Sequence, residues 1–116
     1  MTRETGFPSP AQGYEAKTIN LNDELVMNPE STYLMRVESN KMKWRGVLHK
    51  SVLIVDRSIL PKSGDLVVAY LDGELLCREY FEDKQKKGLY DGESRIFPSV
   101  EDFIFGTVIS IITKLY

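Results

Sequence analysis

Few residues in this chain could carry out nucleophilic or metal chemistry. The sequence contains one cysteine, Cys77, and one histidine, His49, which excludes an internal disulfide and a Cys/His zinc site. Ser39 and Lys41 are two residues apart and would share one face of a strand, so a hydroxyl could stand near an amine, as serine hydrolysis with a lysine base requires. We expect no metal and no cofactor, a structural role for Cys77 and a surface position for His49.

Length and net charge limit the classes of protein to which this chain can belong. At 116 residues, with 42% apolar and 28% charged residues, the chain is expected to form one globular domain. The net charge of −2 argues against tight autonomous nucleic-acid binding, which needs a basic face, so we expect contact with DNA only through a partner. No apolar run is long enough to span a bilayer, and residues 1–20 lack the layout of a secretion signal. We therefore expect a cytoplasmic protein.

The N-terminal part differs from the rest of the chain. Residues 1–12 are polar and contain Gly6, Pro8 and Pro10, a composition that predicts a flexible arm preceding a single domain over residues 13–116. Apolar residues within 21–27 recur at helical spacing and stop before Pro29. This segment is predicted to form one short helix.

After Pro29 the pattern becomes that of β-strands. The Asp72-Gly73 pair stands between two β-like segments and predicts a tight hairpin, since both turn positions need positive φ. Gly106 interrupts a long β-branched stretch, which indicates a bulge or bend. The predicted fold class is all-β and mainly antiparallel, with at most one short helix and with strands at residues 32–37, 52–55, 65–71, 74–81 and 103–115.

Four stretches in this order resemble the LexA/UmuD family, whose domain is shared with signal-peptidase-like serine peptidases. Residues 6–11, GFPSPA, resemble the segment just after the UmuD cleavage site. Residues 33–47, YLMRVESNKMKWRGV, followed by VLIVD at 52–56, resemble the nucleophile segment, where a Ser-Met pair precedes a glycine and an LLIVD strand. Residues 64–74, GDLVVAYLDGE, resemble the family's next strand and hairpin, and residues 103–115 resemble its closing strand. The resemblance implies a LexA/signal-peptidase-like β-clip domain.

The departures from the family pattern fall on its catalytic dyad. Where the family has its nucleophilic serine, before Met42, this chain has Lys41, and where the family has its general-base lysine it has Arg78. Lys41 has no hydroxyl, and a guanidinium does not give up a proton near neutral pH. The resemblance therefore implies a pseudo-peptidase of the S24 type with no catalytic residues.

The start of the chain agrees with this interpretation. UmuD proteins lose an N-terminal arm just before the Gly-Phe-Pro segment, and here five residues precede Gly6. Thr5 and Gly6 mark a vestigial cleavage position. We therefore expect the chain to resemble processed UmuD′.

The resemblance also implies partners. It points to a homodimer and to an accessory role with a UmuC-type Y-family translesion polymerase in the SOS response, with contacts to the RecA filament and the replication clamp. The apolar C-terminal stretch could form the dimer or fill the core. The candidate dimer residues are Phe103, Phe105, Val108, Ile109 and Ile111.

Two rival functions and several alternative site assignments stay open. The chain could be a self-processing peptidase that uses Ser39 or Cys77, or a phage- or plasmid-borne antagonist that pairs with an active UmuD. Lys41 and Arg78 could form an anion- or partner-binding patch or be solvated charges. Met42 and Trp44 could be an exposed contact patch or cover the vacated cleft. Residues 82–87 are predicted to form a loop or hairpin tip, and nucleic-acid contact there is disfavoured because no aromatic residues are interleaved with the charges.

Overall fold

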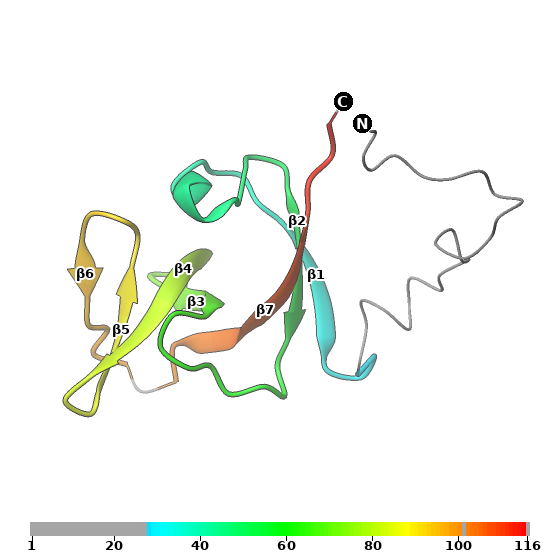
Figure 1. Ribbon diagram of the computed structural model, residues 1–116. Coiled ribbons are helices and arrows are strands. Elements are labelled where there is room, and N and C mark those ends of the chain that lie inside the picture. The colour runs from blue at the N-terminus through cyan, green and yellow to red at the C-terminus, as the bar shows by residue number, and fades with distance from the viewer. Residues whose placement is uncertain (1–27, 101, 116) are drawn as a thin grey trace, which may run out of the picture.

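The computed structural model describes residues 28–100 and 102–115 (Figure 1). The predicted arm over residues 1–12, with Thr5 and Gly6, and the predicted helix over residues 21–27 lie outside the described residues.

The described chain forms one seven-stranded sheet, and every pair of neighbouring strands is antiparallel. The sheet order is β1-β2-β7-β3-β4-β5-β6. A 3-10 helix, η1 (Lys43–Arg45), is the one helical element among the described residues. The all-β prediction is confirmed. The strands are β1 (Thr32–Arg36), β2 (Val52–Asp56), β3 (Leu66–Leu71), β4 (Glu74–Asp83), β5 (Lys86–Tyr90), β6 (Arg95–Ile96) and β7 (Ile104–Ile112).

The Asp72-Gly73 hairpin is confirmed. Both residues have positive φ, 49° and 83°, and they connect β3 to β4 with Leu71 opposite Glu74. A second hairpin connects β4 to β5 through Lys84 and Gln85, which also have positive φ. The sequence predicted a tip there but not the two further strands, β5 and β6, that extend the sheet beyond it (Figure 1).

Gly106 lies beside a bulge, as predicted. Val68 stands opposite Gly106, whereas Ala69 stands opposite Ile104, so Phe105 is the extra residue on β7. A Cβ on Gly106 would lie 2.6 Å from Cγ1 of Val55. The glycine therefore permits close packing of β2 against β7.

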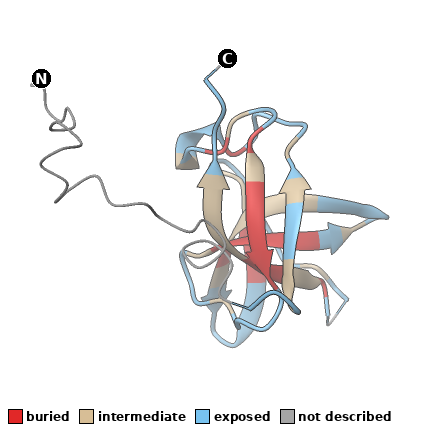
Figure 2. Ribbon diagram, turned by 90° about the vertical axis from the view of Figure 1, so that its right-hand side faces the viewer, coloured by how far each residue is buried: buried red, intermediate tan, exposed pale blue. Residues whose placement is uncertain are grey.

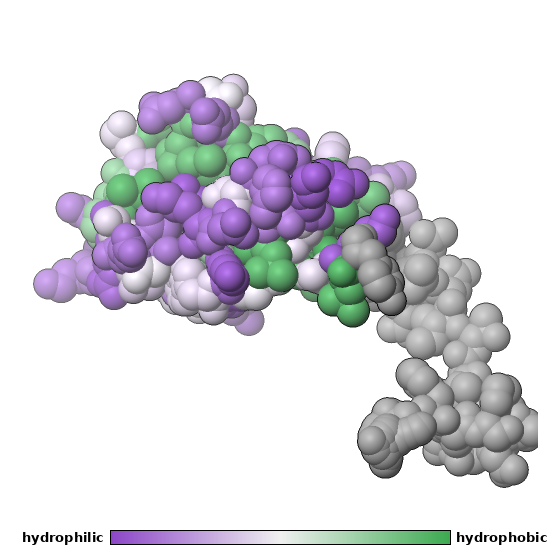
Figure 3. All heavy atoms as spheres, turned by 90° about the horizontal axis from the view of Figure 1, so that it is seen from above, coloured by the Kyte–Doolittle hydropathy of each residue, from purple (hydrophilic) through white to green (hydrophobic). Residues whose placement is uncertain are grey.

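Two apolar clusters occupy opposite faces of the sheet, because side chains alternate along each strand. Figure 2 shows the buried residues concentrated in the central strands. Seen from above, apolar residues reach the surface between groups of hydrophilic ones (Figure 3). The first cluster contains Met42, Val47, Leu53, Val55, Leu66 and Val68. The second contains Val67, Ala69, Tyr80, Leu89 and Phe103.

The predicted C-terminal strand is shorter than expected, Ile104–Ile112 rather than 103–115. Phe103 precedes it and is buried in the second cluster. Phe105, Val108 and Ile111 pack against the first cluster, while Ile109 lies at a register shift between β2 and β7. Core packing within this chain therefore accounts for much of the apolar surface of Phe103, Phe105, Val108 and Ile111.

Candidate functional site

The segment that carries Lys41 is a loop held down at both ends. Val37 donates its N–H to the carbonyl of Ser51, and Lys50 donates to the carbonyl of Val37, at 2.8 and 2.6 Å. Inside the loop, Met42 and Val47 are fully buried in the first cluster. These anchors fix the backbone around Lys41, although the residue itself is exposed.

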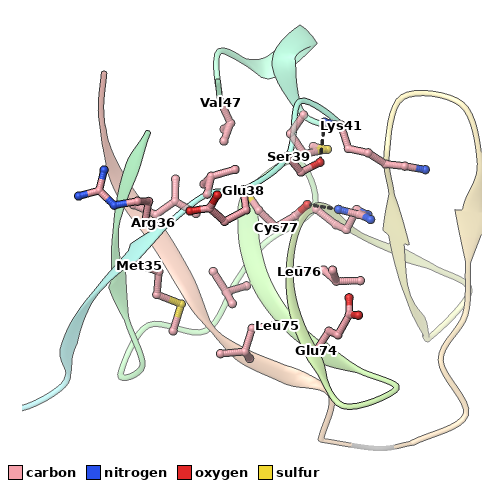
Figure 4. Close-up of a pocket in the computed structure, with 15 residues that line it drawn as sticks. Met35, Arg36, Glu38, Ser39, Lys41, Val47, Glu74, Leu75, Leu76 and Cys77 are labelled. Carbon is pink, nitrogen blue, oxygen red and sulfur yellow. Dashed lines mark hydrogen bonds between the residues drawn. The ribbon is translucent and has the colours of Figure 1, made fainter. Parts of the chain in front are cut away.

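A cavity of about 580 Å³ lies between this loop and strand β4 (Figure 4). Its apolar wall includes Met35, Val37, Leu53 and Val68, from three different strands and the loop. The two dyad positions and the two alternative nucleophiles considered from the sequence all line this one cavity. They are Lys41, Arg78, Ser39 and Cys77.

Neither Ser39 nor Lys41 is arranged for mutual proton transfer. The Oγ of Ser39 accepts a hydrogen bond from the backbone N–H of Lys41 at 3.0 Å. The ammonium of Lys41 instead lies 3.5 Å from the carboxylate of Asp91, in the turn after β5. Figure 4 shows the Lys41 side chain extending toward the β5–β6 side of the molecule, away from the apolar wall.

Arg78 and Cys77 are likewise engaged within β4. The guanidinium of Arg78 donates to the carbonyl of Cys77 at 2.7 Å. Burial raises the pKa of the Cys77 thiol to about 11, and the positive charges of Arg78 and Arg45 oppose this only in part. Cys77 therefore stays a protonated thiol near neutral pH, which agrees with the structural role predicted for it.

A set of contacts that no sequence pattern indicated fastens this loop to strand β4 and to the β5–β6 hairpin. Trp44 donates its Nε1–H to the carbonyl of Asp91 at 2.9 Å and packs edge to face on Tyr90, with 5.5 Å between ring centroids. Arg45 forms an ion pair with Glu79. We call these contacts, together with Lys41–Asp91, the 41–45 clamp.

The clamp decides between the two interpretations of Met42 and Trp44. Met42 is 2% exposed and belongs to the core, so it is not part of an exposed contact patch. Trp44 is 48% exposed and lies against the hairpin rather than over the apolar wall of the cavity. No sequence pattern links residues 41–45 with residues 79–91, since the link arises from the sheet topology.

Fold and cleft together define an all-β domain with a cavity between the 37–50 loop and strand β4. The Peptidase S24-like family matches residues 3–90 of the sequence. This chain belongs to that family, within its LexA/UmuD group.

Individual relatives agree with this assignment. Protein MucA of Salmonella typhimurium is 44% identical over 73 residues, which cover 63% of this chain and 50% of MucA. Protein ImpA of Shigella flexneri is 38% identical over 75 residues, covering 65% of this chain and 52% of ImpA. The LexA repressor of Carboxydothermus hydrogenoformans is 28% identical over 115 residues, covering 90% of this chain and 56% of the repressor. The chain spans about half the length of these relatives.

Within residues 28–100 and 102–115, no group of three or more His, Cys, Asp or Glu side chains is placed to hold a metal ion. In the same residues no helix has the length and apolarity needed to cross a membrane.

Proposed function

We propose that this chain is a catalytically inactive, UmuD′-like accessory subunit, which dimerises and supports a UmuC-type Y-family translesion polymerase in the SOS response. The observation that carries the proposal is the pairing of Lys41 with Asp91 at 3.5 Å. The residue that stands in the family's nucleophile position has no hydroxyl and uses its side chain to fasten the loop to the hairpin.

Self-cleavage by a Ser–Lys dyad needs an alcohol and an uncharged amine in contact. Here the two positions hold an ammonium in an ion pair and a guanidinium bonded to a main-chain carbonyl. A guanidinium is not a proton acceptor. These two contacts support the proposal that the cavity does not carry out Ser–Lys hydrolysis.

The rival function, a peptidase with an unconventional nucleophile, finds less support. The Oγ of Ser39 is bonded to a backbone N–H, and the nearby amine of Lys41 is paired with Asp91. The Cys77 thiol is protonated because burial raises its pKa to about 11. Among the described residues, no hydrogen bond joins either side chain to a base that would activate it.

Strand β7 supports the dimer. It pairs with β3 from Ile104 to Thr107 and with β2 from Thr107 to Ile112. Among the described strands, the half from Val108 onward thus has a neighbour on one edge alone. A second copy could pair along the other edge, with hydrogen bonds between the two β7 strands.

The test of the accessory role is a pull-down of a UmuC-type polymerase by the full chain, together with its mass in solution. We expect a dimer that retains the polymerase. Ile109→Asp should weaken the dimer, because a charge would enter the proposed pairing half of β7, whereas Leu60→Asp, at an exposed position in the β2–β3 connection, should not. A monomer that does not bind the polymerase would contradict the proposal.

A second assay separates the rivals. A UmuD-type N-terminal arm is supplied in trans, and its hydrolysis is followed with the wild-type chain, Ser39→Ala and Lys41→Ser/Arg78→Lys. We expect no hydrolysis by the wild-type chain. Hydrolysis that Ser39→Ala abolishes would establish the peptidase instead, and hydrolysis by the double variant alone would show that the two replacements account for the loss. Heterodimerisation with an active UmuD without polymerase binding would favour the antagonist.

A further inference from the structure

Side chains from β4, β5, β6, the residue after β6 and the 41–45 loop form a continuous row of rings and cations. The Nζ of Lys86 lies 5.8 Å from the centroid of Phe97, and the rings of Phe97 and Phe81 are 5.4 Å apart, edge to face. Arg95 lies over Phe81 at 5.0 Å and over Tyr90 at 5.7 Å. Tyr90 then meets Trp44, as described above. We call this row the cation–aromatic stripe: Lys86, Phe97, Phe81, Arg95, Tyr90 and Trp44.

The stripe lies on the face of the β4–β5–β6 extension that is turned away from the second apolar cluster. Phe81 stands opposite Gly88, and Tyr90 stands opposite Arg95, so these side chains share one face. Tyr80 and Leu89, which alternate with them, are buried on the other face. The rings of the stripe are therefore not required to fill that core.

Two glycines shape the surface of the stripe. A Cβ on Gly88 would lie 2.7 to 2.8 Å from the Cε atoms of Phe81, so this ring lies flat across the strand. A Cβ on Gly92 would lie 2.7 Å from Nε1 of Trp44. Because no side chain rises between the rings at these positions, the stripe is open: Trp44 is 48% and Phe97 45% exposed.

Two cations of the stripe have no ion-pair partner among the described residues and could contact an anionic ligand. Glu79 is paired with Arg45, and Asp91 with Lys41. Lys86 and Arg95 are exposed and form no ion pair with any described residue. Asp83 stands opposite Lys86 in the ladder, and the whole chain carries −2, so the local excess of positive charge is small.

We propose that the cation–aromatic stripe is a contact site for single-stranded nucleic acid. Exposed rings offer stacking surfaces to unpaired bases whatever the sequence, and interleaved cations contact the phosphates. The sequence disfavoured nucleic-acid contact at residues 82–87 because no aromatic residues are interleaved there. The fold adds the rings of Phe97 and Trp44 to those of Phe81 and Tyr90, which flank that segment in the sequence.

The small positive excess sets the strength of this contact. Each cation that neutralises a phosphate makes binding more sensitive to salt, and two available cations predict weak binding. The stripe would therefore hold a strand that another protein has already brought close. Duplex DNA should bind less well, because its bases are not available to stack on rings.

The experiment uses the full chain and a labelled oligothymidylate of about 16 nucleotides, the upper end of the site size of small single-strand-binding domains. Anisotropy of the label measures binding at about 50 mM salt and again at about 200 mM salt. Trp44 is the single tryptophan of the chain, so its emission reports on the stripe directly. We expect saturable binding that quenches Trp44 and weakens at the higher salt.

Matched variants of neighbouring residues, one on the stripe and one on the opposite face, locate the site. Phe97→Ala should weaken binding about fivefold or more, the effect of losing one stacked base. Ile96→Ala removes a side chain of similar exposure, 44%, from the opposite face and should leave binding unchanged. Lys86→Ala and its neighbour Lys87→Ala form a second pair of the same design. All four residues are exposed or half-exposed, and thermal unfolding checks that each variant folds.

Two outcomes would overturn the proposal. One is no anisotropy change and no change of Trp44 emission at the lower salt. The other is equal binding by Phe97→Ala and Ile96→Ala. If Phe97→Ala instead removed polymerase binding while oligothymidylate binding stayed at the wild-type level, the stripe would be a protein interface. Polymerase binding by a chain that fails to bind oligothymidylate would leave the proposed function intact and reject the stripe alone.

Discussion

Lys41 and Asp91 are fifty residues apart in the chain, and their charged groups lie 3.5 Å from each other. The pair joins the loop that lines the cavity to the turn after β5, beside the hydrogen bond from Trp44 to the carbonyl of Asp91. The position that resembles the nucleophile of a peptidase thus contributes to a clamp. The clamp also connects the cavity to the cation–aromatic stripe, since Lys41 lines the cavity and Trp44 is part of the stripe.

The ring rather than the charge should provide most of the clamp's stability. Lys41→Ala is expected to lower the free energy of unfolding by about 0.5 kcal/mol or less, because the Lys41 side chain is 58% exposed and such ion pairs are weak. Trp44→Ala removes a hydrogen bond and an edge-to-face ring pair, and should cost about 2 kcal/mol. Urea unfolding followed by circular dichroism measures both.

Lys43→Ala, which changes an exposed lysine in the same turn, is the control for Lys41. If Lys41→Ala lowered the free energy of unfolding as much as Trp44→Ala, the ion pair would contribute as much as the ring. The proposed ranking of the two contacts would then be wrong.

The carboxylate of Asp91 should make the clamp sensitive to acid. Hydrogen bonds from the N–H groups of Ser94 and Glu93, and the charge of Lys41, lower its pKa from 3.8 to about 2. Folding thus favours the charged form, so its contribution to stability is present above about pH 4 and is lost as the pH falls toward 2. Trp44 emission should change over this range.

Asp91→Asn provides the comparison. The variant should be less stable than the wild type at neutral pH, and the stability difference between the two should shrink as the pH falls from 4 to 2. Asp56 also has a lowered pKa, through hydrogen bonds from Ser58 and Ser31, so it adds the same acid sensitivity to both chains and cancels in the difference. A stability difference that stays constant down to pH 2 would contradict the assignment to Asp91.

The sequence predicted those parts of the fold that depend on local pattern. Asp72-Gly73 specified its hairpin because both residues adopt positive φ, and Gly106 marked the bulge because a Cβ would meet Val55. The strands β5 and β6 were missed because residues 82–87 are mostly charged and β6 is two residues long. Such strands form because a long β4 offers its edge to them, which is a tertiary effect.

The candidate site was predictable only where a family resemblance located it. The resemblance selected Lys41 and Arg78, and the structure places both at one cavity. It did not indicate Asp91, the contacts of Trp44 with the β5–β6 hairpin, or the stripe, because these contacts join segments brought together by the sheet order. Residue composition at 41–45 contains no signal for a partner in a turn fifty residues away.

The packing of Phe81 on Gly88 should be intolerant of a methyl group. Gly88→Ala would place a Cβ against the Phe81 ring, and moving the ring is expected to cost about 1–3 kcal/mol. The φ of Gly88 is not in the left-handed region, so backbone strain does not contribute. Urea unfolding gives the cost.

Phe81→Leu tests the cause of that loss. In the Phe81→Leu chain, the same Gly88→Ala change should cost much less, giving a coupling energy of about 1 kcal/mol or more between the two positions. Equal costs in both backgrounds would show that something other than the ring opposes the methyl group.

The Cys77 thiol should be slow to react, and this property tests the absence of a nucleophile in the cleft. With its pKa raised from 9.0 to about 11 by burial, the thiolate fraction at pH 8 falls about a hundredfold. The higher basicity of the thiolate restores about tenfold in reactivity toward disulfides. A disulfide reagent should therefore react with the native chain about tenfold more slowly than with the chain unfolded in urea, and shielding by the cavity wall should slow it further. A native chain that reacted faster than the unfolded one would reveal an activated thiolate in the cavity that Lys41 and Arg78 line, which would contradict the pseudo-peptidase interpretation.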